Sequence, residues 1–128
     1  MEEKRVKVFI VEDSIVVRER IVNLLSELKE VEIIGYAREA LDAAISINKL
    51  KPDVVILDIR LKGGNGIDVL RNIKNYKHSP KIIVLTNYPF PQYRKKCMDA
   101  GADFFFDKST EFDKIIDVLQ QMIQESKK

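Results

Sequence analysis

The stretch that decides the fold is "DVVILDIRLKGGNG", residues 53–66. Its four consecutive apolar residues, from Val54 to Leu57, are typical of a strand that is buried on both faces of a parallel sheet. The strand runs directly into Asp58, and three glycines follow shortly after the acid. An acid that a buried strand holds rigidly beside a flexible loop is a candidate functional residue.

Four further apolar runs have the length of strands and are rich in Val, Ile and Phe. Together with the run at 53–58, the predicted strands are "VKVFIV" (6–11), "EIIGY" (32–36), "KIIVLT" (81–86) and "DFFF" (103–106). Segments of helical period separate these runs and follow the last one. The alternation predicts an α/β fold of (βα)5 type, a doubly wound parallel sheet with helices on both faces.

Apolar residues on one face define most of the predicted helices. The faces are Val17, Ile21, Leu24, Leu25 and Leu28; Ala37, Ala40, Leu41, Ala44 and Ile45; Ile67, Leu70 and Ile73; and Phe112, Ile115, Ile116, Leu119, Met122 and Ile123. Asn65 is a predicted cap of the third helix, and Thr110 with Asp113 has the spacing of a capping box before the last helix. The segment 90–101 predicts a short fourth helix that ends at Gly101.

Length and composition indicate one soluble domain over residues 1–128, large enough to bury a core without disulfides. The chain has 22 Lys and Arg against 20 Asp and Glu, a net charge of +2. This balance gives no electrostatic reason to expect nucleic acid or a membrane as the main partner. Cys97 is the single cysteine, and the apolar run at the N-terminus is too short for a signal peptide or membrane span, so a cytoplasmic location is expected.

Polar residues stand at the carboxyl ends of four of the five predicted strands. They are Glu12 and Asp13 after the first strand, Asp58 after the third, Thr86 at the end of the fourth and Lys108 just past the fifth. Taken singly, each has a structural explanation, such as helix capping, β propensity or a solvated charge. Taken together, they meet at the edge of the sheet where doubly wound folds bind ligands.

If the first strand lies beside the third, Glu12, Asp13 and Asp58 form a small cluster. Carboxylates held this close repel one another, and a cation relieves the repulsion. All-oxygen ligands with room for water favour Mg²⁺, with Mn²⁺ as its substitute. A carboxylate surrounded by a metal, a lysine and a hydroxyl suits phosphoryl transfer, because these groups neutralise the charge on the phosphoryl oxygens.

The motifs resemble those of the receiver domain of two-component response regulators, over essentially the whole chain. The matching stretches are "VED" (11–13), "LDIRLKGGNG" (57–66), "VLT" (84–86) and "GADFFFDKS" (101–109). The resemblance implies a CheY-like sheet with the strand order 2-1-3-4-5.

By this resemblance, Asp58 accepts a phosphoryl group from a phosphohistidine on a sensor histidine kinase or a histidine phosphotransfer protein. Glu12, Asp13, Asp58 and the backbone carbonyl of Arg60 would hold Mg²⁺. The domain would catalyse its own phosphorylation and dephosphorylation, but it would act mainly as a signalling switch.

The resemblance also implies how the switch works. Lys108 would pair with the phosphoryl oxygens, and Thr86 would move to hydrogen-bond one of them. Phe105 stands at the aromatic switch position, which would rotate inward as the threonine moves, and it lacks the hydroxyl of the more usual tyrosine. The result is a changed partner surface, with homodimerisation on phosphorylation left open.

Several residues depart from the usual receiver pattern. Lys62 and Ser109 stand where proline is usual, so we expect a more mobile loop after Asp58 and a less assured cis peptide after Lys108. Asn87 is larger than the usual residue. We predict that Asn87, Tyr88 and Arg60 partly screen the phosphoryl group from water.

Other readings of the sequence remain. One alternative is a phosphatase of the haloacid dehalogenase type, but such an enzyme needs an acid two residues after the nucleophile, where this chain has Arg60. Another is a flavodoxin-like binder of a nucleotide or flavin, but such a protein needs a phosphate-cradling loop at the end of the first strand, where this chain has two acids. The chain could also be a phosphorylation-independent interaction module. Because the sequence ends where the last helix should finish, no effector domain is expected within it, and it is either a stand-alone receiver or the excised regulatory domain of a longer DNA-binding regulator.

Overall fold

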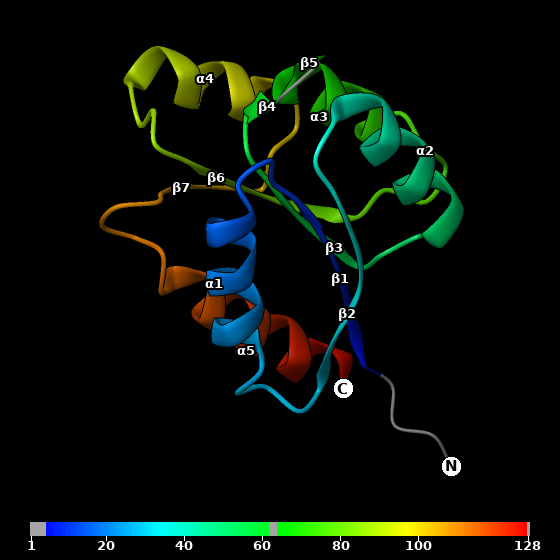
Figure 1. Ribbon diagram of the computed structural model, residues 1–128. Helices are drawn as coiled ribbons and strands as arrows, with labels where there is room; N and C mark the ends of the chain where they lie inside the picture. The colour runs from blue at the N-terminus through cyan, green and yellow to red at the C-terminus, as the bar shows by residue number, and fades with distance from the viewer. Residues whose placement is uncertain (1–4, 62–63, 128) are drawn as a thin grey trace.

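The computed structural model describes residues 5–61 and 64–127, in which five parallel strands form one sheet (Figure 1). The strands of this sheet are β1 (Val6–Val11), β2 (Val31–Ala37), β3 (Val54–Leu57), β6 (Lys81–Thr86) and β7 (Phe104–Asp107). Their order is β2-β1-β3-β6-β7. Since β6 and β7 are the fourth and fifth strands of the sheet, the predicted order 2-1-3-4-5 and the α/β class are confirmed.

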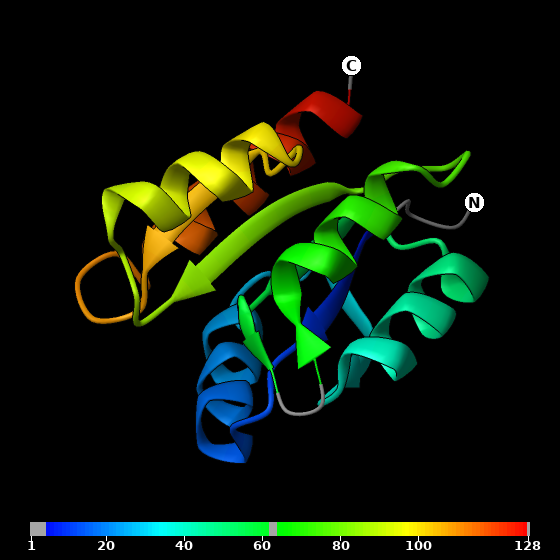
Figure 2. The ribbon, with the colours of Figure 1, turned by 90° about the horizontal axis from the view of Figure 1, so that it is seen from above.

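In the described part of the chain, five helices cover the two faces of the sheet (Figure 2). They are α1 (Ile15–Leu25), α2 (Ala40–Leu50), α3 (Gly66–Lys74), α4 (Pro91–Asp99) and α5 (Lys114–Ser126). Within the described residues, none of these helices combines the length and the apolar character that a membrane crossing requires.

Alternate residues of β3 serve two separate cores, which explains the unbroken apolar run of the sequence. Val54 and Ile56 pack in a cluster with residues of α1 and α5. Val55 and Leu57 pack in a second cluster with residues of α2, α3 and α4. All four side chains are buried, as the parallel-sheet pattern predicts. Burial on both faces fixes the position of the strand and therefore of Asp58 at its end.

The loop after β3 has more structure than its glycines suggested. Arg60 and Leu61, which form β4, pair in antiparallel fashion with β5 (Gly64–Asn65). Asn65 caps α3 as predicted, because its side-chain oxygen accepts a hydrogen bond from the backbone nitrogen of Ile67 at 2.8 Å. Lys62, whose predicted effect was greater loop mobility, lies outside the described residues.

The predicted buried face of α2 is wrong. Leu41 and Ile45 are exposed, and the buried residues of the helix are Ala43 and Ile47. Six of the eight residues from 40 to 47 are apolar, so the sequence is compatible with more than one inward face. Ala43 is buried in the core, and the partly buried Ala40 lies close to Gly64 of the β4–β5 pair.

The predicted capping box before the last helix is also wrong. Helix α5 begins at Lys114, and the side chain of Asp113 makes no capping hydrogen bond. The hydroxyl of Thr110 instead donates to Asp107 Oδ2 at 3.2 Å, and the other oxygen of Asp107 accepts from the backbone nitrogen of Ser109 at 2.8 Å. Asp107 therefore organises the turn after β7, where the Lys108–Ser109 peptide bond is trans.

The short fourth helix is confirmed. It ends at Asp99, and Gly101 follows with a φ of +111°, a left-handed conformation that glycine adopts without strain. Cys97 is the buried residue of this helix.

We expect Cys97 to be chemically silent in the folded protein. Its side chain is buried, and burial raises the pKa of the thiol to about 11. At pH 8 the thiolate is therefore on the order of one thiol in a thousand. Labelling with an aromatic disulfide reagent should be slow at pH 8 in buffer and immediate in strong denaturant. Rapid labelling of the folded protein would contradict this burial.

Candidate functional site

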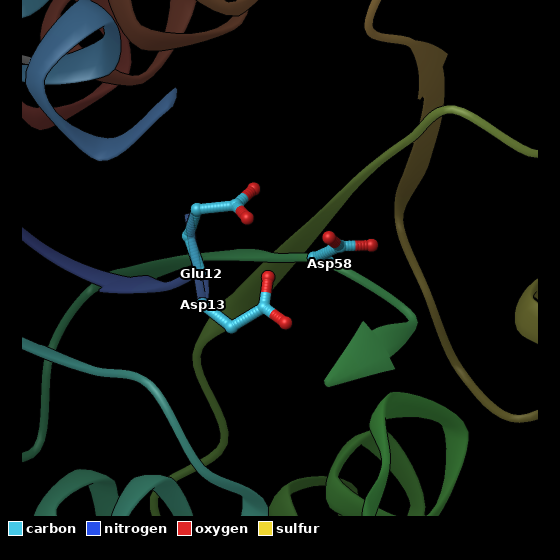
Figure 3. A group of neighbouring side chains, drawn as sticks. All are labelled: Glu12, Asp13 and Asp58. Atoms are coloured by element: carbon cyan, nitrogen blue, oxygen red, sulfur yellow. The ribbon is translucent and has the colours of Figure 1, made fainter. Parts of the chain in front are cut away.

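The carboxyl ends of β1 and β3 bring three acids together (Figure 3). The strands pair in parallel, with Val11 opposite Leu57, and the backbone nitrogen of Asp58 donates to the carbonyl of Val11 at 3.0 Å. Oxygen atoms of Glu12, Asp13 and Asp58 all lie within 4.8 Å of one another. The predicted acidic cluster is therefore present, and the strand register creates it.

Lys108 connects two of these acids. Its ammonium lies 2.7 Å from Glu12 Oε1 and 2.9 Å from Asp58 Oδ2, and all three side chains are buried. The strand arrangement delivers the lysine, because its backbone nitrogen donates to the carbonyl of Thr86 at the end of β6. A residue fifty positions after Asp58 thus becomes its direct partner.

Burial and the lysine act in opposite directions on the charges of the cluster. Burial raises the pKa of Glu12, and this outweighs the lowering by the hydrogen bond from Lys108. Burial by itself would lower the pKa of Lys108, but its hydrogen bonds with Asp58 and Glu12 dominate and raise it. The lysine therefore stays charged in the neutral pH range, where it offsets part of the repulsion among the acids.

Asp58 is held in place from the far side by the following loop. Its Oδ1 accepts a hydrogen bond from the backbone nitrogen of Arg60 at 3.1 Å, and the nitrogen of Gly66 donates to the carbonyl of Ile59 at 2.9 Å. A β-carbon at position 66 would collide with the backbone carbonyl of Asp58. Glycine is thus required at position 66, because the start of α3 passes directly against the backbone of the acid.

Thr86 lies at the end of β6, buried, at the same edge of the sheet as the acids. Its Oγ1 accepts a hydrogen bond from the backbone nitrogen of Tyr88 at 3.0 Å. If this hydroxyl moves, its hydrogen bond with Tyr88 either breaks or pulls the segment that leads into α4 along with it.

Arg60 and Tyr88 lie together across the site. The guanidinium carbon of Arg60 is 4.5 Å from the centroid of the Tyr88 ring, within the range of a cation–π contact. The sequence suggested that both residues flank the site, but it contained no signal that they touch each other. The contact joins the loop after β3 to the loop after β6.

The ring of Phe105 is already buried, with 4% of the residue exposed, and it packs in the core cluster of α2, α3 and α4. The structure thus has this ring in a buried position, and its expected rotation stays a prediction.

The donor set of the cluster fits a hard divalent cation. Only carboxylate oxygens converge in this group of three, and two of the acids, Glu12 and Asp58, already contact a positive group. The third, Asp13, is only partly buried and gives the cluster an opening to solvent. Asp13, Glu12 and Asp58 are thus the residues that could hold a metal ion.

Comparisons with known proteins agree with this geometry. The family model for the response regulator receiver domain matches residues 8–120. The sensory transduction protein LytT of Bacillus anthracis is 35% identical over 115 residues, which cover 90% of this chain and 46% of that protein. The DNA-binding transcriptional activator DevR/DosR of Mycobacterium tuberculosis is 34% identical over 103 residues, with 80% and 48% of the two chains covered.

A solved structure is similar over the whole domain. The DNA-binding response regulator of the LuxR family from Staphylococcus aureus superposes with a TM-score of 0.83 at 28% identity, with 91% of this chain and 97% of that chain covered. The chain belongs to the family of response regulator receiver domains. It spans about half the length of the curated relatives described above.

We expect replacement of Lys108 by alanine to lower the free energy of unfolding in the presence of EDTA. The change would leave Glu12 and Asp58 buried without their shared partner, at a cost of about 1–3 kcal/mol. Mg²⁺ should restore part of the loss, because a cation can replace the ammonium. Urea denaturation with EDTA and with Mg²⁺ measures both effects. The control is Lys114→Ala, which removes an exposed lysine from a pair with Glu111; an equal loss in both variants would contradict the role of Lys108.

Proposed function

We propose that this domain is the phosphoacceptor of a two-component system, in which Asp58 receives a phosphoryl group from a phosphohistidine. The donor is a sensor histidine kinase or a histidine phosphotransfer protein. The observation that supports this most directly is the buried Asp58 with one oxygen on Lys108 and two further acids within 4.8 Å. Membership of the receiver family supports the same conclusion.

In the proposed reaction, a carboxylate oxygen of Asp58 forms a bond to phosphorus while the bond between phosphorus and the histidine nitrogen breaks. The leaving imidazole takes up a proton from solvent. Mg²⁺, or Mn²⁺ in its place, would neutralise charge on the phosphoryl oxygens, held by Glu12, Asp13, Asp58 and the carbonyl of Arg60.

The residues of the chain provide the remaining stabilisation. The ammonium of Lys108 has a hydrogen bond with Asp58 and can transfer it to a phosphoryl oxygen. The hydroxyl of Thr86 would turn from accepting the Tyr88 nitrogen to donating to another phosphoryl oxygen. The added charge of about −2 would thereby shift an equilibrium between two conformations of the domain. The segment after β6 would differ between these conformations and would change the surface that a partner contacts.

A phosphodonor of low molecular weight tests the assignment of the acceptor. Acetyl phosphate with Mg²⁺ should add one phosphoryl group to the protein, seen by intact mass and by its loss in hydroxylamine. The Asp58→Asn variant should add none, and neither should the wild-type protein in EDTA. The control is Asp68→Asn, which changes an exposed acid of α3 and should behave like wild type. Phosphorylation of the Asp58→Asn variant would refute the proposal.

We also propose that Arg60 and Asn87 slow hydrolysis of the aspartyl phosphate. Arg60 is held over Tyr88 beside the acid, and Asn87 lies directly after Thr86. The variant with both residues changed to alanine should lose the phosphoryl group several times faster, because water gains access to phosphorus. Decay of the phosphorylated protein after removal of the donor measures the rate. Arg71→Ala, which removes an exposed arginine of α3, is the control, and an unchanged lifetime in the double variant would exclude the idea.

The output of the domain is proposed from its relatives. The curated relatives described above are about twice as long as the matched region, and one is described as a DNA-binding transcriptional activator. This favours a receiver that regulates an attached domain in a longer protein, with a stand-alone receiver as the alternative. A kinase partner and the buried, unpaired Cys97 support a cytoplasmic location. Homodimerisation on phosphorylation is part of the same proposal.

A further inference from the structure

Helix α4 is the least firmly held of the helices on its face of the sheet. Cys97 is its buried residue, whereas α3 buries five residues along a helix of equal length. The N-cap residue of α4, Phe90, makes no side-chain capping bond. Of the other residues of α4, Tyr93 is partly buried and packs against the same core. Because few apolar contacts fix this helix, a single polar contact can contribute a large share of its attachment.

Arg94 supplies such a contact between α4 and β7, which lie side by side (Figure 2). Its Nη1 donates to the backbone carbonyl of Phe105 at 3.3 Å, and its guanidinium carbon is 5.7 Å from the centroid of the Phe105 ring. One side chain on the exposed side of α4 therefore binds both the backbone and the ring of the residue at the switch position. We call this pair of contacts the Arg94 latch.

The positive charge of Arg94 also acts on the turn after β7. The pKa of Glu111 is lowered, first by its hydrogen bond with Lys114 and then by the backbone nitrogen of Asp107, and the charge of Arg94 adds a smaller contribution in the same direction. Arg94 is thus electrostatically favourable where it lies, near the carboxylate of Glu111 and the ring of Phe105.

The two ends of the segment 86–94 are therefore held by different residues. At one end the hydroxyl of Thr86 accepts from the nitrogen of Tyr88, and at the other end Arg94 holds α4 to Phe105. If the Thr86 hydroxyl turns to a phosphoryl group, the first attachment is lost, and the latch resists displacement of α4 together with the packing of Cys97 and Tyr93.

We propose that Arg94 is a positioning residue that holds α4 in the unphosphorylated arrangement by latching it to Phe105. This inference rests on the proposed phosphorylation of Asp58 and the movement of Thr86. Because the Phe105 ring is already buried, the element that moves is α4, and the latch sets how much of the displaced arrangement is populated before phosphorylation. Loss of the latch should raise that population by about three- to tenfold, the range expected for one exposed cation–π contact with its hydrogen bond.

Hydrogen exchange of the ligand-free protein tests the latch itself. In the Arg94→Ala variant, the backbone amides of α4 should exchange about three to ten times faster than in wild type, while those of α3 should not change. The matched control is Lys95→Ala on the same helix, because Lys95 pairs with Asp99 of α4 at 2.8 Å and bonds to no other element in the described residues. Unchanged exchange in Arg94→Ala, or equal acceleration in both variants, would overturn the proposal.

Titration with beryllium fluoride and Mg²⁺ tests the connection to the switch. A ligand that favours the displaced arrangement gains apparent affinity when that arrangement is more populated, so Arg94→Ala should half-saturate at a concentration several times lower than wild type or Lys95→Ala. Equal half-saturation in all three proteins, despite faster exchange of α4, would show that the latch does not act on the switch. If the Asp58→Asn variant bound beryllium fluoride as well as the wild-type protein does, that result would refute the phosphoacceptor function. The exchange measurement would still decide whether the latch exists.

Discussion

The ammonium of Lys108 between two buried carboxylates is the interaction on which the rest of the site depends. Glu12 and Asp58 could not lie so close, and so far from solvent, without a positive group between them. The acids come from adjacent strands and the lysine from beyond the edge strand β7, so the contact forms only when β1, β3, β6 and β7 are assembled. The same lysine is the group that a phosphoryl oxygen can take over. Under the proposed function, folding and signalling would depend on the same charge.

The sheet gives this charge its precision of placement. Each residue of β3 is buried on one face or the other, and a slip in register would carry Asp53 or Asp58, which flank the apolar run, toward one of the cores. Gly66 adds a second restraint, since the start of α3 presses against the backbone of Asp58. By contrast, α4 is restrained mainly by the buried Cys97, the partly buried Tyr93 and the contacts of Arg94. The site is therefore rigid around Asp58, where the phosphoryl group would attach. It is held less firmly at α4, where a change in conformation would reach a partner.

The features of the fold and the site that can be predicted from the sequence are those that depend on continuous apolar runs. The strands at 6–11 and 81–86 have the predicted bounds, and the other three differ at their ends by one residue. Sheet order then places Glu12, Asp13 and Asp58 at one edge without any knowledge of side-chain conformation. The inward face of α2 could not be predicted, because alanine, isoleucine and leucine occupy both of its sides.

The remaining differences arise from side chains that choose between partners. Thr110 had the spacing of a helix cap, but Asp107 competes for its hydroxyl in the turn. The contacts of Arg60 with Tyr88 and of Arg94 with Phe105 join loops and elements that the sequence separates, and long flexible side chains give no periodic signal. The buried state of Phe105 likewise depends on a rotamer, which local sequence does not determine.

The position of β7 at the end of the sheet has a consequence for solubility. A terminal strand with three consecutive phenylalanines would ordinarily invite pairing with a second chain, because unpaired backbone groups and apolar side chains are offered together. This strand is only four residues long and ends in Asp107, whose carboxylate is committed to the following turn. Arg94 adds a charged side chain along the strand and occupies the carbonyl of Phe105. The phenylalanines therefore pack in two cores, while the short, charged edge strand disfavours pairing with a second chain.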